Sequence, residues 1–180
     1  MKLNNVNHKV NQQIQELINS LKTKDKIRVL FVCLGNICRS PAAEGVFREI
    51  VNENTDTERF EIDSAGTGGW HCGELPDSRM RLHARQRGLN LTHTCRKVSV
   101  SDFDDFDVII GMDAQNVSDL RRLAPSIEAS RKIVLMGDFI DEVLHYDYVP
   151  DPYYEGSEGF ELVLDLLQNG CQNLYNILRR

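Results

Sequence analysis

The sequence predicts an α/β fold with a mostly parallel sheet, because buried apolar runs alternate along the chain with segments of helical period. The first such run, IRVLFVC at 27–33, is apolar and β-branched, as expected of a strand covered on both faces. With 180 residues, 41% of them hydrophobic, the chain suits one compact domain better than two independent cores. In such a fold the ligand crevice lies at the carboxyl ends of the strands.

An extra helix is expected ahead of the first strand, at about residues 8–24. A charged break at 22–26 separates it from the strand, which predicts an N-terminal helical extension, 1–25, and a main domain, 26–180. The pattern leaves open whether this helix packs on the core, mediates self-association or frays. The residues on its apolar face are Val10, Ile14, Leu17, Ile18 and Leu21.

The remaining elements follow from the same alternation of periods. Gly88 and Pro125 mark two helix ends, and residues 139–155 have no lasting period, so we expect a long loop there. The expected elements, in chain order, are a helix at 42–54, a strand at 59–63, a glycine-broken loop at 64–74, a helix at 77–87, a strand at 106–112, a helix at 113–123, a strand at 132–138 and a final helix at 156–178.

Charge and cysteine content narrow the possible partners and location. The net charge of -6 disfavours a protein that grips nucleic acid or an anionic membrane by a broad basic surface. No apolar run approaches the roughly 20 residues of a membrane helix, and the polar first residues do not resemble a signal peptide. The five cysteines include no metal-like C-x-x-C pair, so we expect no metal site and a cytoplasmic location.

The segment CLGNICRS at 33–40 carries the chemistry, because it leaves the first predicted strand and enters a helix. Backbone N–H groups at such a helix start can converge on one anion, for which phosphate is the natural guest. Cys33 fits as a nucleophile, since the helix N-terminus and Arg39 both favour an ionised thiolate. Five residues separate the two, so the loop can curl around a phosphate while the guanidinium forks onto two oxygens.

Other residues of this loop suit the same purpose. Gly35 permits close backbone approach, and Asn36 can hold a left-handed conformation or tie the loop through its amide. Ser40 is expected to cap the helix and to donate to the thiolate. The alternative, a buried strand end at Cys33 and a surface charge at Arg39, is disfavoured by the strand and helix on either side. No G-x-x-x-x-G-K-[ST] pattern occurs, which argues against a nucleotide-hydrolysing P-loop.

The segment VCLGNICRSPAAEGVFR at 32–48 resembles the phosphate-loop signature of the low molecular weight protein tyrosine phosphatases. The resemblance covers the chain from about residue 27 to its end. It implies a small four-stranded parallel sheet with helices on both faces, hydrolysis of phosphotyrosine in protein substrates through a phosphocysteine, and no cofactor. The other motifs in the family's order are DSAGT at 63–67, GWH at 69–71, DSRM at 77–80, FDVIIGMD at 106–113 and DPYY at 151–154.

Asp151 is the candidate general acid, because the family's acid occupies the DP of this motif. Its carboxyl group would protonate the departing tyrosine oxygen and later take a proton from water. Without the resemblance, Asp151 would be read as the start of a turn before Pro152. Asp141 and Asp147 are nearby competitors, but neither precedes Pro-Tyr-Tyr.

The resemblance also implies the residues around a bound substrate. Trp70 and Tyr153 would be aromatic walls of a slot deep enough to exclude phosphoserine. Ile37 matches the tyrosine-directed members, whereas arginine-phosphate relatives favour threonine there. The loop residues expected to bind substrate are Leu34, Gly35, Asn36, Ile37, Cys38 and Ser40, and the polar side chains expected to support the loop are Asn36, Ser64 and His93.

Two rival functions remain. A thioredoxin-linked arsenate reductase would need closely spaced relay cysteines, whereas Cys72 and Cys95 lie 23 positions apart. A silent phosphotyrosine-binding module would not need a nucleophile, an arginine and an acid together. A further hypothesis is that Cys38 forms a reversible disulfide with Cys33 under oxidation and so protects the thiolate.

Overall fold

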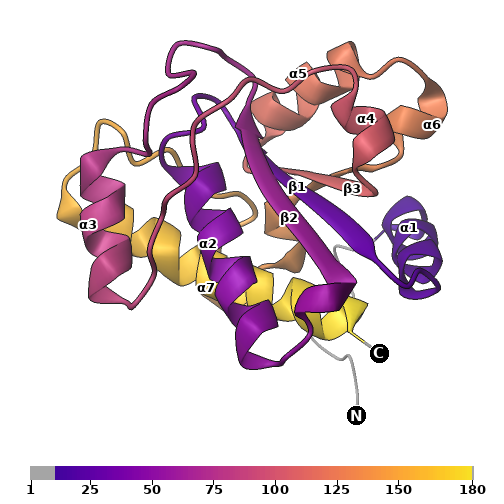
Figure 1. Cartoon of the computed structure of the whole chain (residues 1–180), viewed down its shortest axis with the longest axis horizontal. Helices are drawn as coiled ribbons and strands as arrows, with labels where there is room; N and C mark the ends of the chain where they lie inside the picture. The colour runs from indigo at the N-terminus through magenta and orange to yellow at the C-terminus, as the bar shows by residue number, and fades with distance from the viewer. Residues whose placement is uncertain (1–10, 180) are drawn as a thin grey trace.

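Four parallel strands form one sheet in the computed structural model, which describes residues 11–179 (Figure 1). Their order is β2-β1-β3-β4, so β1 lies between β2 and β3. Cys33 at the end of β1 is in register with Gly66 of β2, and the preceding Val32 with Gly111 of β3. The carboxyl ends of three strands therefore meet at one edge. The strands are β1 Ile27–Cys33, β2 Phe60–Gly66, β3 Val108–Gly111 and β4 Ile133–Leu135.

Helices cover both faces of the sheet, which confirms the predicted fold class (Figure 1). Side chains of β1 alternate between two apolar clusters: Val29 and Phe31 pack toward one, and Leu30 and Val32 toward the other. The first cluster contains side chains of α1 Gln12–Lys22, α2 Arg39–Glu53, α3 Ser78–Gln86 and α7 Ser157–Leu178. The second contains side chains of α4 Asp102–Asp105, α5 Ala114–Leu123 and α6 Ile127–Ser130.

The extra N-terminal helix is present as α1. Ile14, Ile18 and Leu21 are buried in the cluster shared with α2 and α7, so this helix packs on the core. Asn11 begins it by accepting a hydrogen bond from the N–H of Ile14. Val10, expected on the same face, lies outside the described residues. The division of the chain between residues 25 and 26 stays a prediction.

Helix starts near the sheet edge use two kinds of cap. Asp113 caps α5 with its carboxylate in a reciprocal pair with Asn116, and Asp77 caps α3 by accepting from the N–H of Arg79. Helix α2 begins at Arg39 with no side-chain cap. The prediction that Ser40 caps this helix is therefore wrong, because Ser40 lies inside the first turn.

Several segments differ from the sequence-based expectation. Strand β4 ends at Leu135 because the 3₁₀ turn Met136–Phe139 follows it, and β2 continues to Gly66 through its pairing with β1. The expected loop 139–155 packs back on this turn, since a Cβ at Gly137 would lie 1.8 Å from the carbonyl oxygen of Asp147. This loop contains the 3₁₀ turn Glu142–Leu144, a further one precedes β2 at Thr57–Arg59, and the four-residue helices α4 and α6 were not expected.

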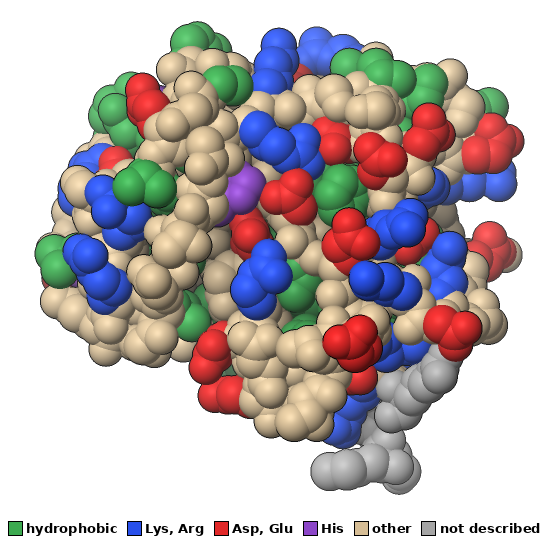
Figure 2. All heavy atoms as spheres, viewed as in Figure 1, with side chains coloured by type: hydrophobic (Ala, Val, Ile, Leu, Met, Phe, Trp, Pro, Cys, Tyr) green, Lys and Arg blue, Asp and Glu red, His purple; other side chains and the backbone are tan. Residues whose placement is uncertain are grey.

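Charged side chains of both signs occur on the surface (Figure 2). Acidic and basic side chains are interspersed over the face drawn in Figure 2. Among residues 11–179, no helix combines the length and the apolar character that crossing a membrane would require.

Candidate active site

The loop after β1 is built to present its amides to an anion. Its carbonyl groups face the surrounding scaffold: the N–H of Thr67 donates to Cys33, that of Gly68 to Leu34 and that of Asp77 to Ile37, at 2.8–2.9 Å. Within the described part of the chain, no backbone N–H of residues 35–38 donates to a protein acceptor. These unpaired donors stand before the start of α2, where the helix dipole adds positive potential.

Asn36 holds the loop in shape from behind. Its φ of 56° is left-handed, and its side chain is fully buried. The amide nitrogen donates to the hydroxyls of Ser40 and Ser64 at 2.9 and 3.0 Å. The amide oxygen accepts from the backbone N–H of Arg96 and from His93 Nε2, both at 2.9 Å. Asparagine is among the few non-glycine residues that tolerate this conformation, and four contacts fix it here.

Cys33 sits at the end of β1 with its sulfur 3.0 Å from the hydroxyl oxygen of Ser40. The same hydroxyl lies 3.2 Å from the carbonyl oxygen of Ala65. A hydroxyl in this position can donate to a thiolate and so favour the ionised nucleophile. Ser40 is fully buried, so it reaches the sulfur from the protein side rather than from the pocket.

Arg39 is held in place by two carboxylates. Its side chain is 2% exposed, with Nη1 2.6 Å from Asp113 and 3.1 Å from the carbonyl oxygen of Val149, and Nη2 3.4 Å from Asp151. Burial acts to lower the pKa of Arg39, but negative charge at Cys33, Asp113 and Asp151 raises it overall. The guanidinium therefore stays charged.

Nine of the predicted residues line one pocket of about 240 Å³. Its floor contains Cys33 and Arg39, and Trp70 and Tyr153 stand at its rim, 71% and 37% exposed. Asn36, Ser40, Ser64 and His93 do not line it. The side chains of Asn36 and Ser40 lie on the side of the loop away from the pocket, where they meet Ser64 and His93. His71 and Tyr154 also line the pocket, although sequence reasoning did not single them out as site residues. The full lining is Cys33, Leu34, Gly35, Ile37, Cys38, Arg39, Trp70, His71, Asp151, Tyr153 and Tyr154.

Asp151 lies at the mouth of the pocket on the loop that precedes α7. One carboxylate oxygen accepts from the N–H of Tyr153 at 3.1 Å, and the other faces Arg39. Arg79 of α3 ties this loop down, because its Nη1 donates to the carbonyl oxygen of Tyr153 at 3.1 Å and its guanidinium lies 5.3 Å from that ring's centre. Asp77 in turn binds the other guanidinium nitrogens.

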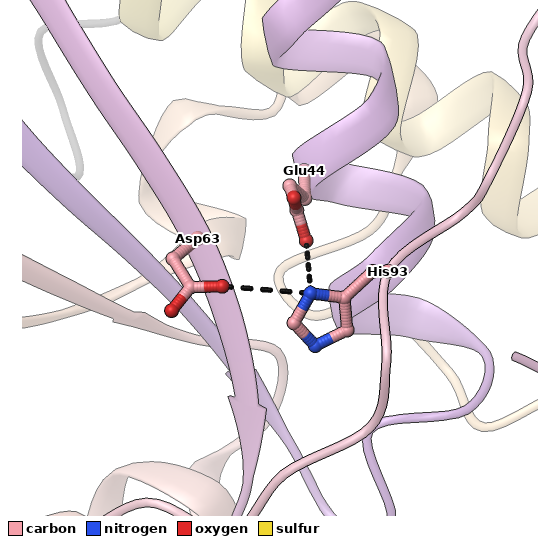
Figure 3. A group of neighbouring side chains, drawn as sticks. All are labelled: Glu44, Asp63 and His93. Carbon is pink, nitrogen blue, oxygen red and sulfur yellow. Dashed lines mark ion pairs between the residues drawn. The ribbon is translucent and has the colours of Figure 1, made fainter. Parts of the chain in front are cut away.

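A group of charged side chains supports Asn36 on its far side (Figure 3). His93 Nδ1 lies 3.2 Å from a carboxylate oxygen of Glu44 and 3.5 Å from one of Asp63. The hydroxyl of Ser64 donates to Glu44 at 2.7 Å. The two carboxylates at Nδ1 and the Asn36 amide at Nε2 together fix the imidazole against the loop.

The same three side chains are the candidate metal ligands of the described residues. One donor atom each of Glu44, Asp63 and His93 lies within 4.8 Å of the others. Arg48 pairs with Glu44, and Arg96 with Asp63, so both carboxylates already have cationic partners. The donor set therefore fits a hydrogen-bonded support of the loop at least as well as a cation site.

The other thiols differ from Cys33 in their surroundings. Burial, followed by the charges of Asp77 and Cys33, raises the pKa of Cys38 far above its usual value. Burial also raises the pKa of Cys95 to about 11 and that of Cys171 still further. Cys95 donates to the carbonyl oxygen of Asn36 at 2.7 Å. These three thiols therefore stay protonated at neutral pH.

Comparisons with known proteins show which proteins this chain is similar to. The family model described as low molecular weight phosphotyrosine protein phosphatase matches residues 28–180. A Schizosaccharomyces pombe protein of that name is 47% identical over 136 residues, covering 74% of this chain and 85% of the relative. The crystal structure of an Entamoeba histolytica protein tyrosine phosphatase with Hepes in its active site is 43% identical, with a TM-score of 0.81, and covers 84% of this chain and 96% of that one. The structure of a drosophila arginine phosphatase is 32% identical, with a TM-score of 0.80, and covers 86% and 99%.

Proposed function

This chain belongs to the low molecular weight phosphotyrosine protein phosphatase family, and we propose that Cys33, Arg39 and Asp151 carry out its chemistry. As a member of that family it is a protein tyrosine phosphatase that works through a phosphocysteine and acts on phosphoproteins. The observation that carries the residue assignment is the loop itself. Its unpaired amides, the thiol of Cys33 and the charged Arg39 surround one small pocket.

In the first step, the Cys33 thiolate attacks phosphorus, and the new S–P bond forms as the bond to the tyrosine oxygen breaks. Asp151 gives its proton to that oxygen, so the leaving group departs as neutral phenol. Arg39 and the loop amides bind the phosphoryl oxygens. They stabilise the negative charge on these oxygens most strongly in the transition state. Asp113 positions Arg39 for this task by its 2.6 Å contact.

In the second step, water attacks the phosphocysteine and Asp151 takes the proton of that water. The S–P bond breaks, inorganic phosphate leaves, and the thiolate returns. Ser40 stabilises the thiolate in both steps from its position 3.0 Å from the sulfur. The position of Asp151 supports its role, because its carboxylate lines the pocket and is 44% exposed, so it can meet the oxygen of an entering phosphotyrosine.

The pocket walls support phosphotyrosine as the substrate. Trp70 and Tyr153 flank the entrance, and a phenyl ring is long enough to place its phosphate on the loop while lying between them. A phosphoserine side chain is shorter and would leave the walls uncovered. Because an arginine phosphatase has a similar structure, phosphoarginine is the alternative substrate that must be tested against phosphotyrosine. Ile37 in the pocket lining favours phosphotyrosine.

An arsenate reductase relay is poorly supported by the remaining thiols. Cys95 is buried, donates to the carbonyl oxygen of Asn36 and has a raised pKa, so it is a weak nucleophile. We also place the enzyme in the cytoplasm. The five free cysteines, the catalytic Cys33 among them, suit a reducing compartment.

The test is release of inorganic phosphate from phosphotyrosine, phosphoserine and phosphoarginine without added metal. Wild type should favour phosphotyrosine, Cys33→Ser should abolish turnover, and Asp151→Ala should lower kcat by about a hundredfold. Arg39→Lys keeps the positive charge but should both raise KM and lower kcat, because lysine cannot bind two phosphoryl oxygens at once. Turnover that survives Cys33→Ser would overturn the assignment. Saturable phosphotyrosine binding without turnover would instead indicate a silent binding module.

A further inference from the structure

A second hollow, of about 530 Å³, adjoins the catalytic pocket. Residues of the loop after β2 and of helix α5 contribute to its lining, and Figure 1 shows where these two segments run. Leu34 and Trp70 belong to the lining of both hollows, so the two are continuous across these side chains. A substrate protein whose phosphotyrosine enters the catalytic pocket can therefore lay its neighbouring residues in this hollow. The other lining residues are Thr67, Gly68, Gly69, Lys97, Val98, Asp119, Arg122 and Leu123.

Trp70 forms a firm ridge between the hollows. A Cβ at Gly68 would lie 1.9 Å from the indole carbon Cζ3, so the ring rests directly on this glycine. The indole is nevertheless 71% exposed and offers apolar surface to a ligand. Leu34, 40% exposed, adds to the same surface. An exposed aromatic ridge with an aliphatic neighbour is a common anchor for peptide segments.

The charge of this hollow is positive, in a protein whose net charge is -6. Lys97 is exposed and has no ion pair or hydrogen bond within residues 11–179. Its aliphatic stem lies against the loop, since a Cβ at Gly69 would be 3.4 Å from Lys97 Cδ. Asp119, the acidic residue of the lining, is already paired with the exposed Arg122. Lys97 is thus a cation without a partner beside the substrate entrance.

We propose that this hollow, which we call the Lys97 groove, binds the acidic segment next to the phosphotyrosine of a protein substrate. The inference rests on the proposed function and names the substrate class for that site. The occupant is an extended peptide whose Asp or Glu side chain meets Lys97 and whose apolar atoms lie on Trp70. Charge complementarity and continuity with the catalytic pocket both favour this occupant.

The experiment compares kcat/KM for two phosphotyrosine peptides, one with Asp and Glu flanking the phosphotyrosine and one with Asn and Gln in their place. Wild type should favour the acidic peptide by about two- to fivefold at low salt, the size that an exposed ion pair supplies. The advantage should shrink at 0.5 M salt, because the charges are solvent-exposed. Lys97→Gln should remove it and Lys97→Glu should reverse it.

Lys26→Glu is the matched control. It makes the same change in net charge, but Lys26 precedes β1 at the opposite end of the sheet from Cys33. This variant should keep the acidic preference of wild type. The proposal would be overturned if Lys97→Glu and Lys26→Glu changed the peptide preference equally. It would also be overturned if the wild-type enzyme did not prefer the acidic peptide.

Hydrolysis of p-nitrophenyl phosphate separates the two levels of inference. This substrate cannot reach the groove, so all three lysine variants should hydrolyse it at the wild-type kcat/KM. A wild-type enzyme that cleaves p-nitrophenyl phosphate but does not distinguish the peptides refutes the groove alone. An enzyme that cleaves neither refutes the proposed function.

Discussion

Replacing Asn36 should loosen the phosphate loop more than any other single change outside the pocket lining. The side chain makes four hydrogen bonds, to Ser40, Ser64, His93 and the N–H of Arg96, and all are lost in Asn36→Ala. Each net hydrogen bond is worth about 0.5–1.5 kcal/mol, and the buried partners lose their acceptor or donor. We therefore expect Asn36→Gly to lower the free energy of unfolding by about 2–4 kcal/mol.

Asn36→Ala should be less stable than Asn36→Gly by about 1 kcal/mol. Alanine has a Cβ that clashes at a φ of 56°, whereas glycine adopts this conformation freely. The pair of variants separates the lost hydrogen bonds from the backbone strain. Both should also lose at least about tenfold in kcat/KM while still folded, because the amides of residues 35–38 no longer converge on the phosphate.

Urea unfolding and hydrolysis of p-nitrophenyl phosphate measure the two effects in the same preparations. An Asn36→Ala protein within about 0.5 kcal/mol of wild type would refute the role of the side chain. An Asn36→Gly protein no more stable than Asn36→Ala would refute the argument from the left-handed backbone. Normal activity in a clearly destabilised variant would show that the loop keeps its shape without this support.

Three further predictions follow from contacts around the site and the core. Arg79→Lys should lower kcat for phosphotyrosine about three- to tenfold, because it frees the loop that carries Asp151. The loss should be smaller for p-nitrophenyl phosphate, whose leaving group depends less on protonation. Equal losses on both substrates would contradict this prediction. The hydrogen bond from Arg87 lowers the pKa of Glu161 in the folded protein. The ionised carboxylate therefore stabilises the fold above the unfolded-state pKa of about 4.3, and this stabilisation is lost as the pH falls through the lower folded-state pKa. Glu161→Gln should therefore lower the urea midpoint at pH 7. The loss of unfolding free energy should be less than about 1 kcal/mol, because the carboxylate is 39% exposed, and the variant should match wild type near pH 2. A difference in stability that does not depend on pH would exclude this linkage. Leu21→Ala should lower the free energy of unfolding by about 2–4 kcal/mol, since the side chain is buried against the core. The kcat of the folded variant should be unchanged. A loss below about 0.5 kcal/mol would mean that α1 contributes little to stability.

The phosphate loop could be predicted because its chemistry is local. Cys33, Gly35 and Arg39 lie within seven consecutive residues, and the strand before them and the helix after them are visible as apolar patterns. The aromatic rim and Asp151 came from the resemblance, since a single tryptophan or a single Asp-Pro pair carries no such information by itself. The structure brings these residues together at one pocket.

The partners of Arg39 and His93 could not be predicted in the same way. Asp113 follows β3, and it reaches Arg39 only because β1 and β3 are parallel neighbours in a set register. Its position directly after a buried strand was the available signal. Glu44 on α2 and Asp63 on β2 likewise meet His93 from distant parts of the sequence. Charged residues at such spacings are ordinarily solvated, and nothing in their local sequence distinguishes them.

The sequence by itself therefore determined the alternation of strands and helices and the position of the phosphate loop, and it pointed to the nucleophile that we propose within that loop. These depend on hydrophobic period and on side chains a few residues apart, which local steric and hydrogen-bonding preferences govern. The tertiary structure alone decided that Asp113 anchors Arg39, that Glu44 and Asp63 meet His93, and that Lys97 stands beside the entrance. Those contacts join residues far apart in the chain, and only strand order and register determine which of them become neighbours.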